Sequence, residues 1–146
     1  MGGGEGDRAG AGGERRSTGQ LVESAAMPYF QPAPSVPVTV VELATFDAAA
    51  RRLWLETERE DLVDFVARSP HSGAIIPGTG GIRKLRWSVS GRGKRGGARV
   101  IYFFHDAGMP VFLLTAYAKN ERTDLTPEDR RRFSQLVASI KEAYGR

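Results

Sequence analysis

Apolar and polar residues alternate along three segments in the second half of the chain, which is the pattern of half-buried β-strands. These segments are 82–88 (IRKLRWS), 98–105 (ARVIYFFH) and 110–119 (PVFLLTAYAK). A β-branched run at 38–43 (VTVVEL) predicts a further strand. The connection between the last two segments is short, so these two strands are expected to form a hairpin.

Two other stretches carry apolar residues at helical spacing. Residues 46–67 are rich in Ala, Leu, Glu and Arg, which favours either one long helix or two short ones. Thr45 is a candidate N-cap for this stretch, and Ser69-Pro70 ends it. The second stretch follows Thr126-Pro127, where Thr is expected to cap a helix and Pro to occupy its first position.

The order of these segments predicts an α+β domain over residues 37–146. We expect an antiparallel sheet of about four strands, with the helices packed on one face and the other face open. Residues 1–36 are rich in Gly and Pro and predict a disordered extension, in which Met27 is an alternative start of the chain. The extension has no signal-peptide core, and the apolar runs are too short to span a bilayer.

Positive charge is concentrated in the middle of the chain. No Asp or Glu occurs between Asp64 and Asp106, a window that holds eight of the 21 Lys and Arg residues. The rest of the chain is acidic, so the net charge of +4 understates a local basic field. Such a field attracts polyanions, above all nucleic acid, although a solvated loop kept soluble by its cations is the alternative.

The sequence does not meet the motif requirements of several enzyme classes. GRGKRG at 91–96 matches G-x-G-x-x-G but precedes a strand, and PGTGGIRK at 77–84 lacks the spacing of a phosphate loop. His71 and His105 are the obvious acid–base pair for RNA cleavage, but their spacing gives no reason to bring them together. The chain has no Cys and shows no metal-ligand cluster, so we predict neither a metal site nor a cofactor.

The strand period of two places several cations on the open face of the predicted sheet. A phenol shares this face, which could hold a phosphate chain and stack a base. An ordinary solvent face with Lys and Arg as edge protection is the alternative. The aligned residues are Lys84, Arg86, Arg99, Tyr117 and Lys119.

Four short blocks in this order, GTGG-RK-RW, GKRGGARVIY, YAKNE and LTPE, resemble the RelE/HigB-type toxins of bacterial type II toxin–antitoxin systems. The resemblance runs from about Val38 to the C-terminal helix and leaves the extension without a counterpart. It implies a small microbial RNase-like α+β domain in the cytoplasm, which enters the ribosomal A site and cuts mRNA. It also implies a HigA-like antitoxin partner with a helix-turn-helix region.

The resemblance carries site residues over to the basic strands and to YAKN. Arg99 and Arg86 are expected to clamp the scissile phosphate, with Lys84 or Lys119 as the candidate base. Related toxins have an arginine near Lys119-Asn120, and some have a tyrosine beyond it, where this chain has Arg122 and Thr123. The further candidate RNA-binding residues are Arg83, Trp87, Arg92, Lys94, Arg95, Tyr102, Tyr117 and Asn120.

Two functions outside this reading stay open at the level of sequence. The same superfamily includes ParE-like toxins that bind DNA gyrase without the basic catalytic set, and the cations at 84, 86, 99 and 119 argue against that function. The chain could also be a basic RNA-binding module that is not a toxin.

Overall fold

The computed structural model describes residues 36–89 and 97–146. The predicted extension at 1–36 therefore lies outside the described residues except for Val36. Three of the candidate RNA-binding residues, Arg92, Lys94 and Arg95, also lie outside them.

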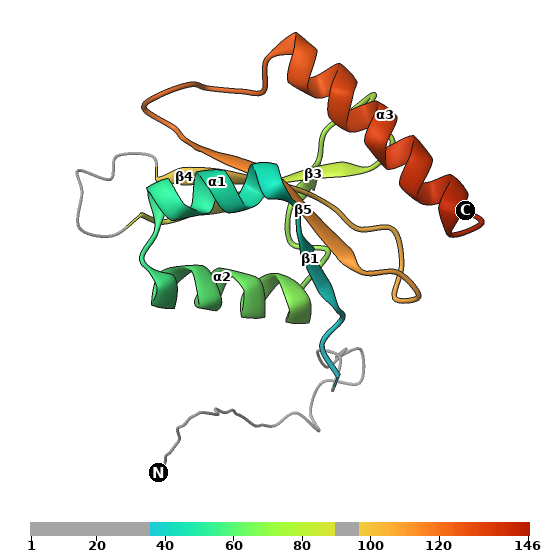
Figure 1. Cartoon of the computed structure of the whole chain (residues 1–146), viewed down its shortest axis with the longest axis horizontal. Coiled ribbons are helices and arrows are strands. Elements are labelled where there is room, and N and C mark those ends of the chain that lie inside the picture. The colour runs from blue at the N-terminus through green and yellow to red at the C-terminus, as the bar shows by residue number, and fades with distance from the viewer. Residues whose placement is uncertain (1–35, 90–96) are drawn as a thin grey trace, which may run out of the picture. The chain divides into compact units, whose positions relative to one another are not determined.

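A five-stranded sheet organises the described residues, in the order β1-β5-β4-β3-β2 (Figure 1). β1 pairs with β5 in parallel, and the other neighbours are antiparallel. The elements are β1 (Val40–Glu42), α1 (Ala44–Leu53), α2 (Glu56–Arg68), β2 (Ala74–Ile75), β3 (Ile82–Trp87), β4 (Ala98–Phe103), β5 (Val111–Ala118) and α3 (Pro127–Ala143). The α+β class is confirmed, and the fifth strand is the two-residue β2, which is too short for an alternating pattern to reveal.

The stretch predicted as one or two helices forms two, because the chain is extended at Trp54 and Leu55. The Trp54 ring is buried, and its indole N–H donates to the Ser88 carbonyl at 3.0 Å. The predicted cap at Thr45 is wrong: α1 begins at Ala44, and the Thr45 hydroxyl donates instead to the Leu114 carbonyl on the sheet. No helix in the described ranges is long and apolar enough to cross a membrane.

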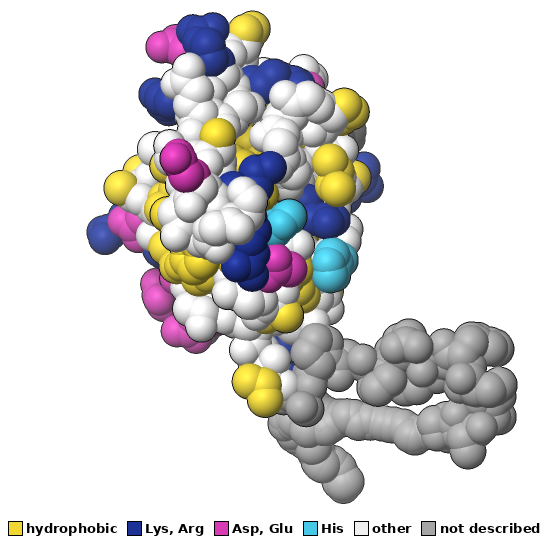
Figure 2. All heavy atoms as spheres, turned by 90° about the vertical axis from the view of Figure 1, so that its right-hand side faces the viewer, with side chains coloured by type: hydrophobic (Ala, Val, Ile, Leu, Met, Phe, Trp, Pro, Cys, Tyr) yellow, Lys and Arg dark blue, Asp and Glu magenta, His cyan; other side chains and the backbone are white. Residues whose placement is uncertain are grey.

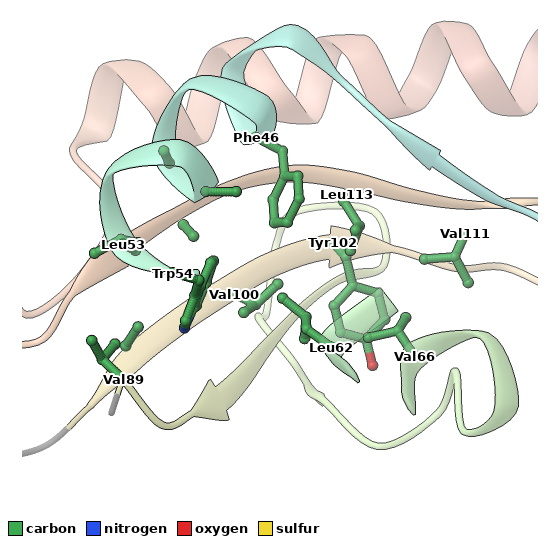
Figure 3. Close-up of a cluster of buried hydrophobic side chains, with 14 of the residues drawn as sticks. Phe46, Leu53, Trp54, Leu62, Val66, Val89, Val100, Tyr102, Val111 and Leu113 are labelled. Carbon is green, nitrogen blue, oxygen red and sulfur yellow. The ribbon is translucent and has the colours of Figure 1, made fainter. Parts of the chain in front are cut away.

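One hydrophobic core lies between the sheet and the pair α1 and α2 (Figure 3). Phe46 and Leu62 from the two helices meet Val100 from β4. The β5 residues Val111 and Leu113 lie in the same cluster, two positions apart as the strand period requires.

A second core lies on the opposite face of the sheet, beneath α3. Figure 1 shows α3 on the other side of the strands from α2. Phe133 and Val137 of α3 belong to it, together with Ile101 of β4 and Phe112 and Leu114 of β5. This arrangement corrects the expectation that all helices share one face. An apolar stripe shows that a helix packs, but it does not say on which side of the sheet, and β4 is apolar on both sides.

Candidate nucleic-acid interface

Three predicted site residues lie directly side by side across three strands. In the register of the sheet, Arg86 of β3 faces Arg99 of β4, and Arg99 faces Tyr117 of β5. Directly opposed residues of an antiparallel pair have Cβ atoms about 5 Å apart and point to the same side. The structure thus brings these three side chains into one row on the α3 side of the sheet.

Lys84 lies on this face too, two residues before Arg86 and opposite Ile101 of the second core. Lys119 follows the end of β5, and its N–H donates to the Gly97 carbonyl at 2.9 Å. The strand period places Lys119 on the side of Tyr117, and we call Lys84, Arg86, Arg99 and Lys119 the basic face. α3 covers only part of this side, since Arg86 remains exposed.

The register places two arginines directly opposite each other. Like charges directly opposite each other in a sheet are destabilising by a fraction of a kcal/mol to about 1 kcal/mol. Arg86 and Arg99 form such a pair in the middle of the basic face. Adjacent guanidinium groups can bind the oxygens of one anion, so this pair is a candidate contact for phosphate.

Tyr117 is more enclosed than its predicted role as a stacking partner requires. The residue is 3% exposed and belongs to the second core. The Arg122 guanidinium lies 5.7 Å from its ring centre, and its hydroxyl donates to the Thr123 carbonyl at 3.5 Å. Burial is the main cause that raises the pKa of the phenol, and Asp124 adds to it. A base could stack on this ring only after Arg122 had moved.

An acidic residue that the sequence analysis did not include reaches the basic face. Oδ1 of Asp124 lies 3.5 Å from Nζ of Lys84, and Oδ2 lies 3.9 Å from the guanidinium of Arg130. The N–H of Leu125 donates to Oδ1 at 2.8 Å. This hydrogen bond is the main reason why the pKa of the Asp124 carboxyl lies below its ordinary value, and the positive charge of Lys84 lowers it further. Forty positions separate Lys84 from Asp124, so local sequence gives no signal of the contact.

A hollow of about 570 Å³ lies between α3 and the loop before β3, beside this contact. Arg130 of α3 joins the helix to the loop before β3, because its guanidinium also donates to the Pro77 carbonyl at 3.4 Å. Leu125, Arg130 and Arg131 line the hollow, so its lining includes both apolar and basic side chains.

Two predicted RNA-binding residues hold a loop in place instead. Tyr102 is fully buried on the α1 and α2 side, where its hydroxyl donates to the Pro70 carbonyl at 2.9 Å and accepts from the Gly73 N–H at 2.7 Å. Burial raises the pKa of this phenol. Arg83 lies opposite Tyr102 in the register and donates to the carbonyls of His71 and Gly73. These residues hold the loop before β2 and are removed from the proposed interface.

Trp87 is also removed from the proposed interface, whereas Asn120 remains a candidate RNA-binding residue. The Trp87 ring packs against Phe65 of α2 at 5.2 Å and against the first core, so it lies on the side away from the basic face. Alternation in β3 already separates Trp87 from Arg86. Asn120 is exposed in the turn after β5, next to Lys119.

The two histidines are both exposed on one side of the molecule (Figure 2). Nε2 of His105 lies 3.7 Å from Asp106, and the His71 ring meets Phe104 edge-on at 5.0 Å. His105 follows the opposite end of β4 from Arg99, about 20 Å away at the rise of a strand. The histidines are therefore not part of the basic face. Within 36–89 and 97–146, no group of three His, Asp or Glu is placed to hold a metal ion.

This chain is similar to known toxins. The structure of an E. coli toxin RelE mutant in the free state matches 69% of this chain and 98% of its own, at 18% identity and a TM-score of 0.47. The family described as the RelE toxin of the RelE/RelB toxin–antitoxin system matches residues 40–145. Because that match spans well over half of the chain and includes the whole basic face, the protein belongs to the RelE family of toxins of toxin–antitoxin systems.

Proposed function

We propose that this chain is a ribosome-dependent endoribonuclease that cleaves mRNA without a metal and thereby stops translation. The observation that carries the proposal is the row formed by Arg86, Arg99 and Tyr117, with Lys84 on the same face. Membership of the RelE toxin family supports the toxin part of the proposal. A ribosomal substrate places the proposed site of action in the cytoplasm.

The reaction assigned to the basic face is attack by the RNA's own 2′-hydroxyl on the neighbouring phosphorus. The bond from the 2′-oxygen to phosphorus forms and the bond to the 5′-oxygen breaks, which leaves a cyclic phosphate and a 5′-hydroxyl. Arg86 and Arg99 are assigned to the charge that builds up on the phosphate oxygens, because guanidinium groups bind such oxygens in pairs.

Two proton transfers remain to be assigned. Lys84 and Lys119 are both candidates for the base that takes the 2′-hydroxyl proton. The phenol of Tyr117 lies in the row beside Arg99 and is a candidate to donate the proton to the 5′-oxygen. A site without His that depends on cations is expected to need a substrate held in place, which the ribosome supplies.

The proposed partner that silences the toxin is a HigA-like antitoxin with a helix-turn-helix region. Family membership implies an antitoxin, and the helix-turn-helix type is part of the proposal. A small adjacent reading frame encoding such a protein is the observation that supports it.

Expression of the full chain without an antitoxin tests the proposed activity. We expect wild type to stop amino-acid incorporation and to produce new mRNA ends. Arg86→Ala and Arg99→Ala should each lower cleavage on translating ribosomes roughly 100-fold, the usual cost of one lost charge-stabilising group. Lys84→Ala and Lys119→Ala identify the base, since loss of the base changes the pH dependence of cleavage and loss of a phosphate contact does not.

Arg51→Ala is the matched control, because Arg51 is an exposed arginine of α1 whose ion pair with Asp47 lies away from the basic face. It should retain wild-type cleavage. Intact mRNA together with DNA damage on induction would instead support gyrase inhibition. Full activity of both Arg86→Ala and Arg99→Ala would reject the site.

A further inference from the structure

Asp124 is built into the fold beside the basic face. Its neighbour Leu125 is buried in the second core, and the next residue, Thr126, caps α3 by accepting from the Asp129 N–H at 3.0 Å. The carbonyl of Thr123 accepts from the Tyr117 hydroxyl. Residues on both sides of Asp124 are thus held, which fixes the position of its backbone beside Lys84.

The pair of Asp124 and Lys84 is accessible to solvent and to ligands. The Asp124 side chain is 46% exposed and that of Lys84 is 33% exposed. A partly exposed pair of this kind contributes little to stability, because water screens its attraction. The same pair matters for binding, since a phosphate that approaches Lys84 meets a carboxylate already there.

We propose that Asp124 competes with RNA phosphate for Lys84 and so makes the toxin discriminate against RNA that is not held on the ribosome. Asp124 is thus a specificity-determining residue rather than a catalytic one. This inference rests on the proposed function and adds to it. RNA free in solution must displace the carboxylate with its own binding free energy. RNA positioned by the ribosome is present at a high effective concentration and displaces it readily.

Binding of RNA that cannot be cleaved tests the competition apart from catalysis. The probe is a short fluorescent 2′-O-methyl oligonucleotide, whose anisotropy is followed with the full chain from low to physiological salt. Asp124→Asn should bind about three- to fivefold more tightly, the range expected when a partly exposed charge pair is removed. Its logarithmic salt dependence should steepen by about 0.7, which corresponds to one more phosphate contact on a single strand.

Three controls separate competition from a change in net charge or in folding. Asp61→Asn makes the same charge change on an exposed part of α2 and should leave affinity within error of wild type. In a Lys84→Ala background, Asp124→Asn should give no gain. The asparagine Oδ1 can still accept from the Leu125 N–H, so the thermal midpoint should stay close to that of wild type.

The two hypotheses fail in different ways. Equal affinities of Asp124→Asn and Asp61→Asn, or a gain that persists without Lys84, would overturn the competition even if the wild type cuts mRNA on ribosomes. Intact mRNA on ribosomes, with the gain in oligonucleotide binding present, would reject the proposed reaction and leave the competition standing. Asp124→Asn should raise the cleavage of free RNA by a larger factor than the cleavage of RNA on the ribosome, which is the full expected result.

Discussion

At the scale of single residues, two tyrosines on adjacent strands have different roles because they lie on opposite sides of the sheet. Tyr102 points into the first core, where its hydroxyl has one donor and one acceptor as partners. Tyr117 belongs to the second core, where its hydroxyl makes one long contact next to the basic face. Sequence composition does not separate them, but their positions relative to Arg99 do.

Tyr102→Phe should lower the free energy of unfolding by about 1–3 kcal/mol, the cost of leaving a buried polar group without its partner. The reason is that the Gly73 N–H, in a buried residue, loses its acceptor. Urea denaturation followed by circular dichroism measures the change. Cleavage by the folded variant should be unaffected, because Tyr102 lies away from the basic face.

Tyr117→Phe is the matched variant and should give the opposite pair of results. Its hydroxyl bond to Thr123 is long and only partly buried, so stability should change by less than about 0.5 kcal/mol. Loss of the phenol should slow cleavage if Tyr117 supplies the proton. Equal stabilities of both variants would contradict the structural role of Tyr102.

At the scale of elements, the start of α3 could be predicted because it depends on residues that are adjacent in the sequence. Thr126 caps the helix, Pro127 occupies the first turn, and Glu128 and Asp129 place negative charge near the N-terminus, where the helix dipole favours it. Asp124 lies two residues before the cap and contacts Lys84 of the basic face. The cap therefore matters for the site as well as for stability.

Thr126→Ala should cost about 1 kcal/mol of unfolding free energy, because the Asp129 N–H loses its side-chain acceptor. Thermal and urea denaturation measure this cost. Thr123→Ala is the control: Thr123 is exposed, and the contact that involves it uses its carbonyl, which alanine keeps. A cost for Thr123→Ala as large as that for Thr126→Ala would show that the loss does not come from capping.

At the scale of the whole described domain, segments distant in sequence are joined at the C-terminal end. The guanidinium of Arg146 donates to both carboxylate oxygens of Asp106, at 2.8 and 2.9 Å. The connection between β4 and β5 is thereby attached to the end of the chain beyond α3. The ion pair keeps the C-terminus on the side of the molecule shown in Figure 2.

This pair predicts a dependence on pH. Arg146, and next to it the Gly108 N–H, lowers the pKa of Asp106 to about 2. A lowered folded-state pKa means that the contribution of Asp106 to stability is fully present above its ordinary value of 3.8 and is lost as pH falls towards about 2. Titration of the Asp106 carboxyl by NMR should give this midpoint. Arg146→Gln should move it back towards the ordinary value, and an unmoved midpoint would contradict the pairing.

The sequence was sufficient to predict those features of the fold and of the site that depend on local patterns. Alternation placed Lys84, Arg86 and Arg99 on one face, and it also placed Tyr102 with Val100 on the other, a signal that argued against counting Tyr102 among the RNA-binding residues. The start of α3 followed from Thr126 as its cap and Pro127 in its first turn.

The remaining features depend on contacts between distant segments. The side of the sheet chosen by α3 is decided by how its stripe fits Phe112 and Leu114, which no periodicity encodes. Asp124 meets Lys84 across forty positions, through a loop whose path is set by the burial of Leu125. The roles of the individual cations in chemistry remain predictions that the variants above test.

The packing of both sides of the sheet limits how β3 can change in length. Arg86 and Leu85 are neighbours in sequence, yet one faces the arginine of β4 and the other faces Val100 in the first core. Inserting or deleting one residue ahead of them would exchange their sides, burying a guanidinium and exposing a leucine. Homologues that differ in length within this strand should therefore differ by two residues or carry a bulge that restores the phase.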